Sequence, residues 1–184
     1  MIRVYNTLSK SKEPFEPVVP GKVGIYLCGP TVYKPSHIGH MVGPVIFDAI
    51  KRYLVYNGYD VTWVVNITDV DDKLINRSIE TGKPVDEIAA EYTDAYFRLL
   101  DDLRVLSPTF SPRATEHVQE MVELIAALIE TGHAYERDGD VYFRVASFPD
   151  YGKLSGRTLA DQEIGSRVEA SEKKEDPLDF TLWK

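Results

Sequence analysis

The chain has 184 residues, of which 43% are hydrophobic, 27% charged and 11% aromatic. This balance is typical of a folded globular protein and excludes disorder as the main state, and the length predicts about one domain. The 21 basic and 29 acidic residues leave a net charge of −8. Such a balance argues against a free-standing nucleic-acid-binding module, because those modules neutralise phosphates with a basic face. If RNA is a partner, most of its binding surface is expected elsewhere.

The cysteine content and the apolar runs bear on the cellular compartment. Cys28 is the single cysteine, so no intrachain disulfide can form. The first residues contain no apolar stretch of signal-peptide length, and nowhere do 18 apolar residues follow one another. These features predict a cytoplasmic protein with no membrane partner.

The first 22 residues contain three prolines at intervals of three, a spacing that also occurs in polyproline ligands of aromatic grooves. The flanking Glu13 and Glu16 and the shortness of the stretch favour an extended lead-in to a strand instead. The run from Val23 to Cys28 then predicts a buried strand, which a Gly-Pro pair ends.

A helical period follows between Gly43 and Asn57, where apolar or small residues recur on one face, and Asn57-Gly58 is predicted to end the helix. The residues on that face are Gly43, Ile46, Phe47, Ile50, Tyr53 and Leu54. A second β-rich run covers residues 60–67. Strand, helix and strand within about 45 residues predict a βαβ unit with two parallel strands.

Two helices are predicted next. Asp69, Asp71 and Asp72 open the first of them, where carboxylates suit the positive end of the helix dipole. The second follows Pro84 and has one apolar face. The residues of that face are Ile88, Tyr92, Ala95, Tyr96, Leu99 and Leu103.

The last third of the chain predicts a helix, a hairpin and a loop. Ser111 as N-cap with Pro112 at the first helical position is a strong signal for the start of the helix. Residues 135–145 predict a β-hairpin, whose Asp-Gly pair suits a type I′ turn. Residues 171–179 are expected to form a charged loop.

The stretch from Cys28 to His40 lies between the first predicted strand and the first long helix, a junction at which open α/β sheets bind ligands. It lacks both common glycine-rich phosphate loops, but His37 and His40 stand three residues apart at the helix N-terminus. At this spacing both imidazoles lie on one side of the first turn and can donate hydrogen bonds to a phosphate. Gly39 between them lets a flat base approach the backbone. Taken alone, the pattern also fits a capping or solvent-exposed histidine pair.

Several motifs together resemble one family. His37-Ile38-Gly39-His40 matches the histidine signature of class I aminoacyl-tRNA synthetases. Further segments resemble cysteinyl-tRNA synthetases and follow the order of that family, at residues 26–33, 66–73, 112–115, 132–135 and 179–184. The resemblance covers essentially the whole chain and is far more specific than the histidine signature alone.

The resemblance implies an α/β fold: the first half of a Rossmann-like nucleotide-binding domain, with parallel strands, followed by part of a helical and hairpin connective insertion. It implies an enzyme that activates L-cysteine with ATP and Mg²⁺ to cysteinyl-adenylate and transfers it to tRNA(Cys). Because the carboxylate attacks the α-phosphorus, negative charge grows on phosphate oxygens during this step. His37 and His40 are expected to donate to those oxygens, and Pro30, Thr31 and Gly39 to complete the ATP contacts.

Cys28, judged by its position alone, is a small buried residue at a strand end. The resemblance implies instead that it is one of four zinc ligands, and that the zinc binds the thiol of the substrate cysteine. A plain pocket separates cysteine from the near-isosteric serine by only about 100-fold, whereas a Zn–thiolate bond recognises sulfur directly. Thr68 is implied to line the same amino-acid pocket.

The family's three other zinc ligands, its Lys-Met-Ser-Lys-Ser loop and its anticodon-binding domain are expected after Lys184. His117 and His133 lack the spacing of zinc ligands, and structural roles are predicted for both. We expect residues 1–110 to form the first half of the catalytic domain and residues 111–184 a truncated connective segment. The chain alone is predicted to be inactive, and tRNA is expected to bind mainly through the missing regions.

Two alternatives remain at this point. A cysteine ligase of the mycothiol pathway adenylates cysteine in the same way and passes it to a sugar amine, but its histidine motif usually has Leu where Ile38 stands. A non-catalytic, synthetase-like binding or regulatory module is the other. The coding sequence beyond Lys184 would discriminate among the three hypotheses.

Overall fold

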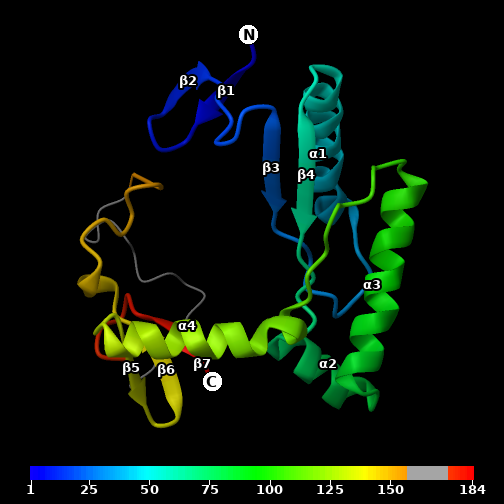
Figure 1. Cartoon of the computed structure of the whole chain (residues 1–184). Coiled ribbons are helices and arrows are strands. Elements are labelled where there is room, and N and C mark those ends of the chain that lie inside the picture. Colours follow the sequence, from blue (N-terminus) through cyan, green and yellow to red (C-terminus); the bar gives the residue numbers. More distant parts are fainter. Residues whose placement is uncertain (157–173) are drawn as a thin grey trace. The chain divides into compact units, whose positions relative to one another are not determined.

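The computed structural model describes residues 1–156 and 174–184 (Figure 1). Contacts between residues divide the chain into two compact units, Glu16–Val118 on the one hand and Met1–Phe15 with Gln119–Lys184 on the other. The division expected after residue 110 stays a prediction. The first three residues of the charged loop expected at 171–179 lie outside the described residues. None of the helices in the described part of the chain is both long and apolar enough to cross a membrane.

The unit Glu16–Val118 is built on a βαβ arrangement, as predicted. Strand β3 (Lys22–Leu27) leads through helix α1 (Ile38–Tyr56) to strand β4 (Asp60–Val65), and the two strands pair in parallel over their full lengths. Gly58 follows α1 with a φ of +87°, which is a conformation that favours glycine. The strand, the helix and the helix stop were therefore all readable from the sequence.

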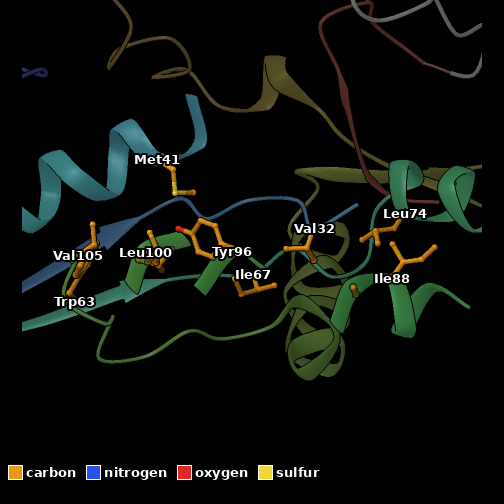
Figure 2. Close-up of a cluster of buried hydrophobic side chains, with 11 residues drawn as sticks. Val32, Met41, Trp63, Ile67, Leu74, Ile88, Tyr96, Leu100 and Val105 are labelled. Carbon is orange, nitrogen blue, oxygen red and sulfur yellow. The ribbon is translucent and has the colours of Figure 1, made fainter. Parts of the chain in front are cut away.

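The core of this unit draws residues from β4, α1, α2 (Asp72–Thr81) and α3 (Val85–Asp102), as Figure 2 shows. Trp63 and Val65 of β4 are completely buried. Burial of such a side chain stabilises the fold by about 1.5–3 kcal/mol. The buried members are Val32, Met41, Trp63, Val65, Ile67, Leu74, Ile88, Ala89, Tyr96, Leu100 and Val105.

The edge of β4 that faces away from β3 is covered by an extended segment, and this corrects the helix start expected at Ser111. The backbone N–H groups of Val65 and Ile67 donate to the carbonyl oxygens of Phe110 and Pro112, at 3.1 and 2.9 Å. Unpaired backbone groups along a strand edge are costly when buried, and this demand overrides the local capping signal. The helical turn begins only after this segment.

Helix α1 buries only part of the apolar face predicted for it: Leu54 is buried and Phe47 packs against the core, but other members of that face do not. Its buried residues are Met41, Pro44, Asp48 and Leu54, whereas Ile46 and Ile50 are exposed. The Asp48 carboxylate accepts hydrogen bonds from Nε of Arg52 and the backbone N–H of Leu106, at 2.8 and 2.9 Å. A satisfied carboxylate therefore fastens α1 to the loop after α3, a contact that an apolar pattern cannot reveal.

The second unit opens with a hairpin, which corrects the extended lead-in expected for the first 22 residues. Strand β1 (Arg3–Asn6) pairs with strand β2 (Ser11–Pro14) in antiparallel register. Pro14 stands at the end of β2, where a missing N–H does not interrupt the ladder. The prolines therefore permit a strand here, although their spacing suggested none.

The same unit contains the predicted hairpin. Strand β5 (Ala134–Arg137) pairs with β6 (Asp140–Phe143), and the intervening Asp138 and Gly139 have φ values of 54° and 82°. Two positive φ values are what a type I′ turn requires, so the predicted turn is confirmed. Strand β7 (Phe180–Trp183) adds to β6 as a third strand, which the sequence pattern did not reveal. Helix α4 (Val118–Glu130) precedes this sheet.

Candidate functional site

The candidate site lies where β3 and β4 end and α1 begins (Figure 1). The backbone N–H of Val32 donates to the carbonyl oxygen of Thr68 at 3.2 Å, and the N–H of Thr68 donates to the carbonyl oxygen of Pro30 at 3.1 Å. Thr31 and Thr68 thereby form a parallel bridge beyond the two strands. The structure thus brings together three residues that the sequence analysis assigned to ATP and to the amino acid.

Asn66 holds this junction together, and the sequence analysis missed it. Its Oδ1 accepts hydrogen bonds from the backbone N–H of Gly29 at 2.8 Å and from the hydroxyl of Tyr26 at 2.9 Å. Its Nδ2 donates to Oγ1 of Thr68 at 3.4 Å. One amide side chain therefore ties the end of β3, next to Cys28, to the threonine beyond β4. Two signals could have pointed to it: a polar residue inside a run predicted to be a strand, and its place at the start of the family-like segment 66–73.

Residue 29 must be glycine because the junction leaves no room for a side chain. A Cβ atom at residue 29 would overlap the backbone carbonyl group of Asn66. We expect Gly29→Ala to lower the free energy of unfolding by about 1–3 kcal/mol, as overpacking against rigid backbone does. Urea unfolding measures the loss.

Gly24 supplies the matched control, because it lies in β3 and a Cβ there would meet nothing within 4 Å. Gly24→Ala should change the stability by no more than about 1 kcal/mol. Equal stabilities for the two variants would contradict the close approach at Gly29.

The two histidines of the signature are held by the backbone at the start of α1. His37 is the N-cap, and its Nδ1 accepts the N–H of Gly39 at 3.1 Å. Nδ1 of His40 accepts the N–H of His37 at 3.0 Å, and the ring centroids are 4.0 Å apart. Because a backbone N–H can only donate, each neutral ring carries its hydrogen on Nε2. Both rings therefore keep an Nε2–H donor that the capping bonds do not use.

The packing of His37 also explains why residue 39 is a glycine. A Cβ atom there would lie 2.9 Å from Cε1 of His37, closer than real side chains pack. Glycine thus leaves room for the capping imidazole, whether or not a base approaches the backbone.

The pKa of His40 is lowered from its ordinary value of 6.5, chiefly by burial and then by the neighbouring charges of His37 and Lys34. A lowered pKa keeps this imidazole neutral at pH 7, as the capping geometry requires. We expect an NMR titration of the chain to give a His40 midpoint below 6.5, and Lys34→Gln to raise it. Lys83→Gln, which removes a charge paired with Glu91, should leave it in place. A midpoint above 6.5 would contradict the described environment.

Cys28 is exposed at the end of β3, which corrects its interpretation as a small buried residue. An accessible thiol suits a soft metal such as zinc. Among residues 1–156 and 174–184, however, no three His, Cys, Asp or Glu side chains are grouped so that they could hold a metal ion. Cys28 can thus supply one zinc ligand, and the described residues do not complete the site.

The three aspartates near the start of α2 have different roles. Asp71 is the N-cap of α2 and accepts the N–H of Lys73 at 2.8 Å, as predicted, and Asp72 lies in the first turn. Asp69 is buried and accepts both the backbone N–H and the hydroxyl of Thr115, at 3.0 and 2.6 Å. Asp69 therefore joins two separate motifs of the sequence rather than complementing the helix dipole.

His133 lies away from this site in sequence and has structural contacts. Its Nδ1 is 2.8 Å from Oγ of Ser147, and its ring stacks on Phe143 with the centroids 6.5 Å apart. These contacts agree with the structural role predicted for it.

Comparisons with known proteins assign the chain to a family. A family model described as the catalytic domain of class I (C) tRNA synthetases matches residues 14–184. The chain belongs to this family. It is 52% identical over 192 residues to a cysteine–tRNA ligase of Thermus thermophilus, covering 98% of this chain, and 52% identical over 184 residues to one of Staphylococcus epidermidis, covering all of it. The chain spans 40% of the length of each of these curated relatives.

Solved structures of the same class share the fold. Mycobacterium tuberculosis methionyl-tRNA synthetase, solved with methionyl-adenylate, aligns with a TM-score of 0.58 at 18% identity, over 69% of this chain and 33% of that one. A leucyl synthetase of Agrobacterium radiobacter K84, solved with tRNA, aligns with a TM-score of 0.57 at 20% identity, over 72% of this chain and 17% of that one. The Rossmann-like fold expected from the sequence is therefore confirmed.

Proposed function

We propose that this chain is the N-terminal part of the catalytic domain of a cysteine–tRNA ligase. The parent enzyme activates L-cysteine with ATP and Mg²⁺ and transfers it to tRNA(Cys). The observation that carries this proposal is the 52% identity to cysteine–tRNA ligases over essentially the whole chain. A mycothiol-pathway ligase and a non-catalytic module find no comparable support.

The described geometry suits the activation step. As the α-phosphate is attacked, charge grows on its oxygens, and the Nε2–H groups of His37 and His40 are preorganised donors at a helix N-terminus. Pro30 and Thr31 lie on the segment between β3 and these histidines, where the adenylate would be held. Neutral imidazoles donate without a change of charge, so the capping bonds persist during the reaction.

For the amino acid, we propose that Cys28 and Thr68 line the pocket. Asn66 links the backbone next to Cys28 with the Thr68 hydroxyl, so the two side chains are supported by one hub. A zinc ion bound through Cys28 would supply recognition of the substrate thiol, with its further ligands from residues outside this chain. The enzyme is expected to act in the cytoplasm.

The test is ATP–pyrophosphate exchange by the full-length parent protein. Exchange should depend on cysteine and not on serine or methionine, and tRNA(Cys) should accept the cysteinyl group from the adenylate with release of AMP. Transfer to a sugar amine instead would favour the mycothiol-type alternative. Absence of any cysteine-dependent exchange would favour the binding module.

The 184-residue chain by itself should form no cysteinyl-tRNA. It should also bind zinc weakly, because Cys28 supplies one thiolate where a structural zinc site has four ligands. Metal analysis after dialysis against a mild chelator measures the zinc that stays bound. Stoichiometric zinc in the monomeric chain would contradict it.

A further inference from the structure

A pocket of about 380 Å³ lies beside α2, in the unit Glu16–Val118, and none of its residues belongs to the ATP or cysteine site proposed above. It is lined by Tyr33, Lys34, Lys73, Asn76, Arg77 and Glu80. Tyr33 and Lys34 come from the segment before α1, and the other four from α2. Three cations therefore face one carboxylate, in a chain whose net charge is −8.

Only one of these cations has a described acidic partner. Arg77 pairs with Glu80 at 3.2 Å. The ammonium groups of Lys34 and Lys73 lie 5.1 and 5.6 Å from the centroid of the Tyr33 ring, and neither forms an ion pair with another described residue. Two like charges gathered on one ring repel each other, and a bound anion would relieve that repulsion.

The pocket adjoins the candidate reaction site. Lys34 stands three residues before His37, and its charge contributes to the electrostatic surroundings of His40. Lys73 follows Asp71, the N-cap of α2, and the backbone N–H of Lys73 donates to that cap. Lys34 thus lies on the connection that carries His37, and Lys73 stands in the first turn of α2, just after the connection that carries Thr68.

We propose that this pocket binds a backbone phosphate of the RNA strand that receives the amino acid. The inference rests on the proposed function: the acceptor end must reach the adenylate beside His37 and His40, so its phosphates pass close to this pocket. Two ammonium groups that have no acidic partner within residues 1–156 and 174–184, together with the Asn76 amide, suit a phosphodiester, and ammonium contacts of this kind make binding salt-dependent. Glu80 in the lining disfavours the denser charge of a triphosphate.

The experiment compares Lys73→Gln with Lys83→Gln in the full-length parent protein. Both changes remove one positive charge near α2, but Lys83 pairs with Glu91 and does not line the pocket. Binding of a tRNA(Cys) transcript is measured by fluorescence anisotropy over a range of salt concentrations. We expect Lys73→Gln to weaken binding about tenfold and to reduce the slope of log K against log salt by about 1, while Lys83→Gln changes neither. Lys73→Arg, which keeps the charge, should retain most of the affinity.

ATP–pyrophosphate exchange without tRNA separates the two sources of phosphate. If Lys73→Gln raised KM for ATP as much as it weakened tRNA binding, the pocket would serve the nucleotide and the proposal would fail. Equal tRNA affinity for the two glutamine variants would overturn it as well. A wild-type protein that binds tRNA but shows no cysteine-dependent exchange would instead count against the proposed function.

Discussion

Replacement of His40 by alanine in the full-length enzyme is expected to lower kcat for cysteine-dependent ATP–pyrophosphate exchange by about 100-fold to 1,000-fold, with little change in KM for cysteine. The reason is that the Nε2–H of His40 is used chiefly when charge develops on the α-phosphate, and loss of one preorganised donor typically costs about 3 kcal/mol of transition-state stabilisation. Steady-state exchange kinetics at several cysteine concentrations measure both parameters.

A second substitution separates this role from capping. His40 occupies the third position of α1, where it accepts the N–H of the N-cap residue His37. Glutamate at that position restores the same capping bond but offers no donor where Nε2–H stood. His40→Glu should therefore keep the stability of the wild type and still lose the rate, whereas Ile38→Ala, at an exposed neighbouring side chain, should leave exchange unchanged. A fall in kcat for His40→Ala that His40→Glu restores would show that His40 acts only through the helix.

Cys28→Ser in the full-length enzyme should impair the binding of cysteine rather than the chemical step. A hydroxyl is a poor ligand for zinc, so the metal is expected to be lost or loosened. KM for cysteine should rise, and discrimination against serine should fall toward the roughly 100-fold that a plain pocket provides. Exchange kinetics with cysteine and with serine, together with the zinc content, measure these effects.

The kinetic patterns of the two residues are expected to differ in kind. His40→Ala should lower kcat and leave the zinc content intact, whereas Cys28→Ser should raise KM and lower the zinc content. A Cys28→Ser enzyme that kept both its zinc and its affinity for cysteine would disprove the ligand role of this thiol. A His40→Ala enzyme that changed only KM for cysteine would show that the imidazole contacts the amino acid rather than the α-phosphate.

Local patterns of the sequence determined several elements of the fold, among them those that carry the candidate site. The run that became β3, the helical period of α1, the Asn-Gly helix stop and the Asp-Gly hairpin turn are signals within a few neighbouring residues, and local sterics decide them. The spacing of His37 and His40 likewise sufficed to place both at the start of a helix, because one turn brings residues three apart together.

Only the tertiary structure decided which distant groups satisfy one another. Asn66 reaches Gly29, and Asp69 reaches Thr115, across separations of 37 and 46 residues. The segment around Ser111 became an edge partner of β4 despite a good capping signal, since the backbone groups of that strand needed partners. The orientation of α1 also depends on a distant hydrogen-bond partner. The face of the helix that holds Asp48 meets the loop after α3, while more apolar residues of the helix stay exposed. Such pairings depend on hydrogen-bond partners far apart in the sequence, and a one-dimensional pattern of hydrophobicity and propensity carries no record of them.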